Sequence, residues 1–228
     1  PLYSSAASDV YKRQTSNKPM SLAVMQDENI LVEHTTNIKR NHSVQLMPAI
    51  QKIIEEAGIT KRDINAIIVA KGPGSYTGLR IGVTTAKTLA YALNTELYGV
   101  SSLEALAATL PDTQTEQLIV PVFDARREAV YTGVYQYQEG QLVNLLEDQY
   151  MLITDLNDYL NQQQQPHVFV GHDLENITEL LNGPIIHQLP NASVMQSLIT
   201  QPENIHTFKP DYLKLSEAER NWLKTQQN

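Results

Sequence analysis

Apolar and polar residues alternate in the first regular part of the chain, and the period then changes. The run SLAVMQDENILVEHT, which starts at Ser21, predicts two strands around the polar turn DEN. From about Ser43 apolar residues recur every three or four positions, which predicts an amphipathic helix ended by Gly58. These positions are Val44, Leu46, Met47, Ile50, Ile53 and Ile54. After the turn TKRD, the run INAIIVA predicts a strand buried on both faces.

The next run, GPGSYTGLRIGVTTAKTLAYAL, predicts a loop and a helix. Glycine and proline mark the loop, and Ser75 or Thr77 is placed to cap a helix that reaches about Leu93. Small side chains fall on one face of this helix, at Gly78, Gly82, Ala86 and Ala90. Such a stripe lets another backbone come close, although an interior glycine costs about 1 kcal/mol relative to alanine. The stripe either packs inside its own lobe or docks another subunit.

The second half of the chain repeats this layout. The runs LIVPVFD, EAVYTGVYQY and LVNLLED predict three strands, and TDLNDYLNQ predicts a helix after them. The tail, KPDYLKLSEAERNWLKT, predicts a short helix with Ser216 as cap and Glu219 in a capping box. Two similar units indicate an internal duplication, and hence two α/β lobes around a cleft. We predict an N-terminal lobe over residues 15–100 and a C-terminal lobe over residues 101–228.

The first fourteen residues, PLYSSAASDVYKRQ, show neither strand alternation nor helical spacing, and they begin without Met. We interpret residues 1–14 as a foreign or mis-assigned segment, with an ordinary frayed terminus as the alternative. By the duplication, the first lobe should also open with an apolar strand. The segment before Thr15 is expected to supply none.

Composition narrows the possible functions. The chain of 228 residues has 17 Lys and Arg against 25 Asp and Glu, a formal net charge of -8, which argues against independent binding to nucleic acid. It has no cysteine, so disulfides and thiolate metal sites are excluded. No run reaches the roughly 18 apolar residues of a membrane span, and the start does not resemble a signal peptide. We expect a soluble, cytoplasmic protein.

Few residues combine into a recognisable reactive site. None of the six histidines pairs with another at helical spacing, so a preformed two-histidine metal site is not expected, and His42 is a candidate cap or interface contact. The glycines around Gly74 fit neither common phosphate-loop pattern. The run DARRE at 124–128 is either a solvated salt-bridge cluster or a site where Arg126 and Arg127 meet carboxylates or phosphates of a partner.

Four runs together resemble the TsaB (YeaZ) family: KGPGSYTGLRIGVTTAKTLAYAL, GVSSLEALA, DARREAVYTGVY and KPDYLKLSEAE. The resemblance spans about Thr15 to Glu219. It implies an α/β fold with two duplicated lobes of the actin, sugar-kinase and heat-shock-chaperone type, ribonuclease-H-like, with mixed sheets flanked by helices. Family members typically open with a strand ending in Asp-Thr-Ser, whereas this chain has Arg13-Gln14-Thr15-Ser16. Without that strand the first lobe would lose several kcal/mol, on the order of a few buried side chains.

The resemblance also implies a function. The TsaD metalloenzyme transfers a threonylcarbamoyl group to the adenosine 3′ of the anticodon in tRNAs that read codons starting with A, and TsaB is its non-catalytic partner. A TsaE-like ATPase is the third partner, and tRNA is reached only through the complex. ATP and a divalent metal are used through the partners, and this chain alone binds no cofactor. An independent small-molecule kinase or metallohydrolase of the same fold, or a nucleic-acid-binding module, is the alternative.

The resemblance places the helix after GPGSYTG at the contact between subunits, both in a homodimer of the isolated chain and with TsaD. The paired-histidine metal motif of TsaD is replaced here by RNHSVQLMP, with His42 alone. We therefore expect no catalytic, cofactor-binding or metal-binding residue in this chain. The expected interface residues are His42, Gly74, Tyr76, Gly78, Arg80, Gly82, Ala86 and Ala90.

Overall fold

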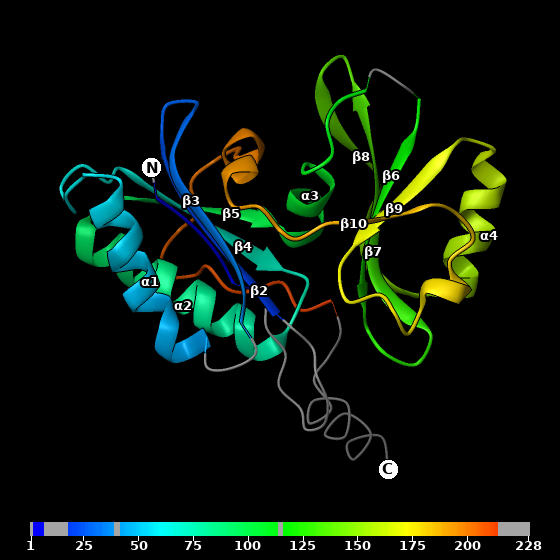
Figure 1. Ribbon diagram of the computed structural model, residues 1–228, viewed down its shortest axis with the longest axis horizontal. Coiled ribbons are helices and arrows are strands. Elements are labelled where there is room, and N and C mark those ends of the chain that lie inside the picture. The colour runs from blue at the N-terminus through cyan, green and yellow to red at the C-terminus, as the bar shows by residue number, and fades with distance from the viewer. Residues whose placement is uncertain (1, 7–17, 39–41, 114–115, 214–228) are drawn as a thin grey trace, which may run out of the picture.

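The computed structural model of the chain describes residues 2–6, 18–38, 42–113 and 116–213. Two α/β lobes lie side by side, and each is built on one five-stranded sheet (Figure 1). This arrangement confirms the predicted pair of lobes with mixed sheets flanked by helices.

The first sheet has the strand order β3-β2-β1-β4-β5. Its strands are β1 (Leu2–Ala6), β2 (Lys18–Gln26), β3 (Asn29–Ile38), β4 (Ala66–Gly72) and β5 (Glu96–Ser101). β2 runs antiparallel to β1 and β3, whereas β4 runs parallel to β1 and β5. The hairpin SLAVMQDENILVEHT is confirmed as β2 and β3, and INAIIVA is confirmed as β4. β5 has no counterpart among the predicted strands.

The second sheet has the order β10-β9-β6-β7-β8, and counted from β8 this order repeats that of the first sheet strand by strand. Its strands are β6 (Leu118–Asp124), β7 (Ala129–Gln138), β8 (Gln141–Leu152), β9 (His167–Gly171) and β10 (Ile185–His187). In both sheets a three-stranded antiparallel meander is followed by a helix and by a strand parallel to the first. The shared order confirms the internal duplication and makes β1 the counterpart of β6.

The expectation that no strand precedes Thr15 is wrong. Leu2–Ala6 forms β1 at the centre of the first sheet, where Leu2 lies opposite Val24 of β2 and Ser4 opposite Val69 of β4. A central strand pairs its backbone on both edges, so the two neighbouring strands favour an extended segment there even without apolar alternation. The rest of the atypical segment, with Arg13-Gln14-Thr15-Ser16, lies outside the described residues, and its foreign origin stays a prediction.

Helices cover each sheet. α1 (His42–Glu56) and α2 (Tyr76–Leu93), both predicted, cover one face of the first sheet, and α4 (Ile153–Gln163) covers one face of the second (Figure 1). The first core contains Met20, Leu22, Val24, Leu46, Ile50, Ile53, Ile67, Val69, Val83, Ala86, Ala90 and Leu97. Full burial of one large aliphatic side chain stabilises by roughly 1.5–3 kcal/mol, so these layers hold each lobe together.

A short helix, α3 (Ser102–Ala107), lies between the two sheets. Its Leu103 and Leu106 pack against Ile119 and Tyr135 of the second sheet. On its other side Ala105 joins a cluster with the first sheet and with the 3-10 helix η2 (Ser193–Leu198). α3 thus fills the space between the lobes. A second 3-10 turn, η1 (Thr178–Leu180), belongs to the second lobe.

Residues 199–213, here called the C-terminal strap, return to the first lobe. Backbone hydrogen bonds of 2.7 Å join the Glu203 amide to the Leu97 carbonyl and the Asp211 amide to the Lys71 carbonyl. The strap therefore lies along β5 and the end of β4. The predicted terminal helix around Ser216 and Glu219 lies outside the described residues.

Candidate protein interface

The turn before α2 fixes where that helix begins. Ser75 is the N-cap, and its hydroxyl accepts a 3.4 Å hydrogen bond from the Gly78 amide, so it is the cap of the two candidates. Gly72 has a φ of 126°, in the region that favours glycine, and the Asp211 carbonyl occupies the place of its missing side chain. Gly74, an expected interface residue, is half-buried in this turn.

The four small residues of α2 face their own lobe. Gly78, Gly82, Ala86 and Ala90 are all buried, and the helix lies against β4 and β1. Ala86 and Ala90 pack in the first core together with side chains of the sheet. The structure therefore corrects the expectation that this stripe contacts another subunit: its small side chains let the helix backbone lie close to the sheet.

The opposite face of α2 carries larger side chains. They are Tyr76, Arg80, Thr84, Thr88 and Tyr91, and all are exposed. Tyr76 and Tyr91 are 43% and 70% exposed. Arg80 donates from Nη1 to the Tyr76 hydroxyl at 3.1 Å, and its guanidinium carbon lies 5.2 Å from the centroid of the Tyr76 ring. Of the expected interface set on this helix, Tyr76 and Arg80 are accessible to a partner.

α1 also leaves apolar side chains exposed. Leu46, Ile50 and Ile53 occupy the side of the helix that touches the sheet, so Val44 and Met47 stay 69% and 48% exposed. The six apolar positions of this helix are more than one buried face can hold. In the sequence, this excess was the signal that some apolar side chains of the helix stay exposed. His42 is the first residue of α1, and its side chain lies outside the described part of the chain.

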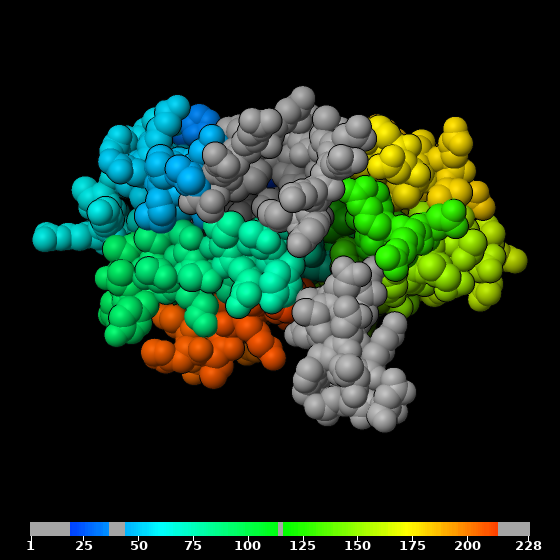
Figure 2. Space-filling model, turned by 90° about the horizontal axis from the view of Figure 1, so that it is seen from below, coloured from blue at the N-terminus to red at the C-terminus, as the bar shows by residue number. Residues whose placement is uncertain are grey.

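The two helices lie side by side on the same side of the sheet, α1 in blue and α2 in green (Figures 1 and 2). Their exposed side chains form one surface, which we call the two-helix face. It comprises Val44, Met47, Tyr76, Arg80, Thr84, Thr88 and Tyr91. An apolar surface with a cation inside it is suited to binding another protein.

A chain of hydrogen bonds joins the two lobes. Ser101 caps α3, because its hydroxyl accepts from the amides of Leu103 and Glu104 at 3.1 and 3.2 Å. The same hydroxyl donates to Asp148 of β8, and the Tyr135 hydroxyl of β7 donates to the other carboxylate oxygen at 2.5 Å. Sequence reasoning missed this junction, although Ser101 and Tyr135 lie within the runs that carry the family resemblance.

The junction holds two acids in a low-polarity environment. Burial raises the pKa of Asp148 above its usual value, and the hydrogen bonds from Ser101 and Tyr135 oppose that rise. Burial, together with the charge of Asp148, also raises the pKa of Glu104. The positive charge of Lys71 opposes the rise of both pKa values without cancelling it. The Lys71 ammonium group lies 3.7 Å from the carboxylates of Glu203 and Asp211 in the strap.

The DARRE run forms the turn between β6 and β7. Arg126, Arg127 and Glu128 have φ values of 68°, 58° and 55°, which are uncommon for residues with a side chain. The Arg126 amide donates to Asp124 at 2.7 Å, and its guanidinium lies 3.5 Å from the same carboxylate. Arg126 therefore belongs to a local salt bridge, whereas a contact of Arg126 and Arg127 with anionic groups of a partner stays a prediction.

Within the described ranges, no group of three or more His, Cys, Asp or Glu side chains is arranged to hold a metal ion. His172 is half-buried beside the Phe123 ring, with ring centroids 5.9 Å apart, and this burial lowers its pKa to about 4. None of the helices over the same ranges is both long and apolar enough to cross a membrane.

Known proteins resemble this chain in sequence. A family model described as TsaD, tRNA N6-adenosine threonylcarbamoyltransferase, matches residues 29–198. The tRNA threonylcarbamoyladenosine biosynthesis protein TsaB of Bacillus subtilis is 40% identical over 223 residues, covering 93% of this chain and 96% of that protein. TsaB of Escherichia coli is 32% identical over 126 residues, covering 55% of this chain and 54% of that protein.

Solved structures share the fold. A Pseudomonas aeruginosa protein described as similar to the peptidase YeaZ superposes with a TM-score of 0.77 at 24% identity, covering 93% of this chain and 99% of its own. YeaZ from Pseudomonas aeruginosa superposes with a TM-score of 0.72 at 21% identity, covering 93% and 98%. The resemblance seen in the sequence is thus confirmed over nearly the whole chain. The chain belongs to the TsaB (YeaZ) family of tRNA threonylcarbamoyladenosine biosynthesis proteins.

Proposed function

We propose that this chain is a non-catalytic partner subunit of the bacterial threonylcarbamoyl transferase complex, and that it binds and activates a TsaD-like metalloenzyme through the two-helix face. The complex modifies the adenosine 3′ of the anticodon in tRNAs that read codons starting with A. One observation carries the proposal: α1 and α2 expose large apolar side chains although each also buries a full face in the core.

The composition of the two-helix face favours a protein partner. Val44, Met47, Tyr76 and Tyr91 are the large apolar side chains that these helices expose. Full burial of each would contribute roughly 1.5–3 kcal/mol, and aromatic residues, Met and Arg are enriched in protein interfaces. Arg80 offers a charged hydrogen-bond donor beside the apolar surface.

The relation to TsaD supports the choice of partner. Because the TsaD family model matches residues 29–198 of this chain, which include α1 and α2, a TsaD-like protein is expected to carry counterparts of both helices. Two helix pairs of similar shape can pack across an approximate twofold axis. The same geometry allows two copies of this chain to form a homodimer when the partner is missing.

The remaining chemistry is proposed to come from partners. The TsaD-like enzyme would supply the divalent metal, and a TsaE-like ATPase would use ATP. With a formal net charge of -8, this chain would reach tRNA only through the complex. The Ser101 hydroxyl caps α3 and bonds to Asp148 in the junction between the lobes, so its role is structural.

A reconstituted transfer reaction tests the proposal. TsaD-like and TsaE-like proteins, threonylcarbamoyl-AMP and tRNA are combined with or without this chain, and modified adenosine is measured. We expect strong dependence on the chain, and no transfer when it replaces the TsaD-like protein. Met47→Asp should abolish the stimulation, whereas Leu145→Asp, at an exposed apolar position of β8 in the other lobe, should retain it. Transfer or ATP turnover by the chain alone would instead support an independent enzyme.

A further inference from the structure

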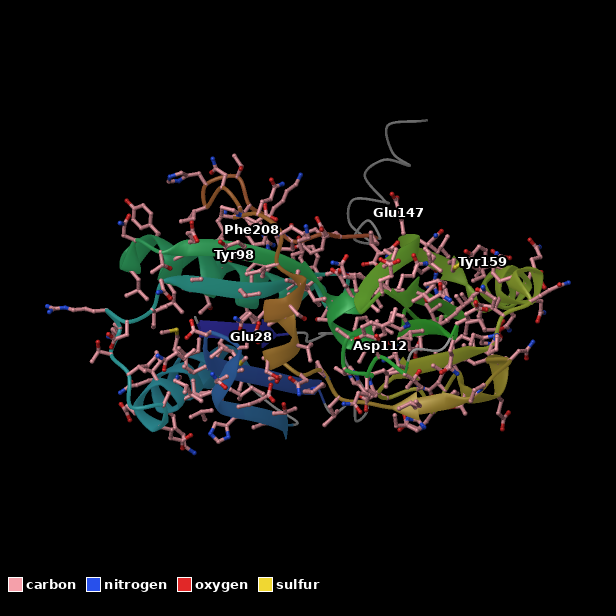
Figure 3. The ribbon with its side chains drawn as sticks, turned by 90° about the horizontal axis from the view of Figure 1, so that it is seen from above. Glu28, Tyr98, Asp112, Glu147, Tyr159 and Phe208 are labelled. Carbon is pink, nitrogen blue, oxygen red and sulfur yellow. The ribbon has the colours of Figure 1, made fainter. Side chains whose placement is uncertain are left out.

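The C-terminal strap is built into the first lobe. Phe208, labelled in Figure 3, is buried in the first core. Gly99 of β5 makes room for it, because a Cβ at that position would lie 2.6 Å from the ring. The Lys87 ammonium group of α2 donates to the Phe208 carbonyl at 2.6 Å and to the His206 carbonyl at 3.4 Å. These contacts fix the path of the strap beside α2.

A second set of contacts holds the far end of the strap. The Asp211 amide is bound to the Lys71 carbonyl, and the Asp211 carboxylate lies 3.7 Å from the Lys71 ammonium group. Its carbonyl fills the space left by Gly72. Glycines at positions 72 and 99 thus both accommodate the strap, so its position is specified by the sheet and not by the strap alone.

The anchored strap meets α2 at both exposed tyrosines. Tyr91, near the end of the helix, makes an edge contact with His206, with ring centroids 6.2 Å apart. Tyr76, at its start, stacks on Tyr212, with centroids 4.7 Å apart and ring planes at 29°. The strap, in orange, therefore lies along the side of α2 that faces away from α1 (Figure 2).

From this arrangement we infer that the strap is a third element of the docking surface, and that the partner contacts Tyr212 and His206 together with the two-helix face. The inference rests on the proposed function, and the occupant is the TsaD-like chain. A partner surface that reaches Tyr76 and Tyr91 cannot avoid the rings stacked beside them. Tyr212 is itself 39% exposed, and His206 is exposed.

The geometry also describes what the partner presents. The guanidinium of Arg80 lies over the Tyr76 ring and the Tyr212 ring stacks on the same tyrosine, so the cation and the two rings form one stacked aromatic platform. An apolar helical surface with a carboxylate opposite Arg80 is complementary to this platform. Tyrosine at such a position is frequently among the few residues that dominate binding.

Calorimetric titration of the full chain with the TsaD-like protein tests the inference. We expect Tyr212→Ala to raise the Kd about tenfold, as loss of an interface tyrosine typically does. Tyr212→Phe keeps the stacked ring, so its Kd should stay within about twofold of that of the unaltered chain. Leu145→Ala should leave the Kd unchanged. Circular dichroism melts of each variant confirm that the lobes remain folded.

Photo-cross-linking separates direct contact from an indirect effect. Benzoylphenylalanine in place of Tyr212 should capture the TsaD-like protein, whereas the same probe in place of Leu145 should not. If the unaltered chain binds while Tyr212→Ala binds equally well, or if the probe at position 212 captures nothing, the strap is not part of the interface. If the unaltered chain does not bind at all, the proposed function itself is overturned, and the inference with it.

Discussion

Tyr135 donates a 2.5 Å hydrogen bond to Asp148, and this pair anchors the contact between the two lobes. Both residues belong to the second sheet, while Ser101, which completes the junction, ends the last strand of the first sheet. Gly133 leaves the space that the Asp148 carboxylate fills. Because Ser101 also caps α3, one half-buried carboxylate links the second sheet, the first sheet and the helix between them.

Removing the Tyr135 hydroxyl should weaken the fold. Tyr135→Phe leaves one oxygen of the half-buried Asp148 carboxylate without its donor, so we expect the free energy of unfolding to fall by about 1–3 kcal/mol. Urea denaturation at neutral pH measures this. Tyr98→Phe is the matched control, because the Tyr98 hydroxyl donates to Glu96 at the surface, and its cost should stay within about 0.5 kcal/mol. Equal costs for both variants would contradict a special role of the junction.

The raised pKa of Asp148 predicts a pH dependence. The folded chain holds this proton more tightly than the unfolded chain, so the stability it contributes is present below the unfolded pKa and is lost as pH rises through the raised value. Asp148→Asn keeps an acceptor for Tyr135 but cannot ionise. We therefore expect the stability of this variant, relative to the unaltered chain, to increase as pH rises from the ordinary aspartate value of 3.8 through the raised value of the folded chain. Urea midpoints at several pH values test this, and a constant difference would count against it.

His172 should act in the opposite direction. Burial lowers its pKa from 6.5 to about 4, so the unfolded chain takes up a proton that the folded chain refuses. Stability is present above the unfolded pKa and is lost as pH falls toward the folded one. His172→Leu removes this effect, and we expect the loss of stability on acidification to shrink by up to about 3 kcal/mol. An unchanged acid dependence of the unfolding midpoint would show that His172 is protonated in the folded chain.

Gly99 should be intolerant of a side chain. Gly99→Ala places a methyl group against the Phe208 ring, so we expect a destabilisation of about 1–3 kcal/mol and faster proteolysis of the strap. Phe208→Leu in the same chain should reduce the additional cost of the alanine, because the smaller side chain gives way. Thermal melts of the two single variants and the double variant measure this coupling. Strictly additive changes would mean that the two residues do not compete for the same space.

The two faces of α2 should respond differently to the same substitution. Ala86→Leu overpacks the core, so we expect it to lower the free energy of unfolding by about 1–3 kcal/mol. Thr84→Leu, on the exposed face, should leave the melt nearly unchanged and alter binding of the TsaD-like protein. Thermal melts and titrations of both variants decide the matter. A folded Ala86→Leu variant that had lost only binding would restore the small-residue stripe as the interface.

The sequence predicted the elements that local spacing determines. The hairpin of β2 and β3, the helices α1, α2 and α4, and the strands β4 and β6 to β8 all follow from apolar periodicity and turn residues, which are properties of neighbouring positions. The duplication was visible for the same reason. β1 was missed because pairing with β2 and β4, and no pattern of its own, places it at the centre of the sheet.

The candidate interface, too, was determined in part by the sequence and in part by the tertiary structure alone. The sequence determined that one face of a helix carries Gly78, Gly82, Ala86 and Ala90. Through the family resemblance, it also indicated this helix as part of the interface with a partner. Only the tertiary structure decided that this face turns inward and that Tyr76 and Arg80 point outward, because spacing fixes which side chains lie together but not what lies opposite them. It also brought Tyr212 to Tyr76 and Asp148 to Ser101, contacts between residues far apart along the chain that no local pattern records.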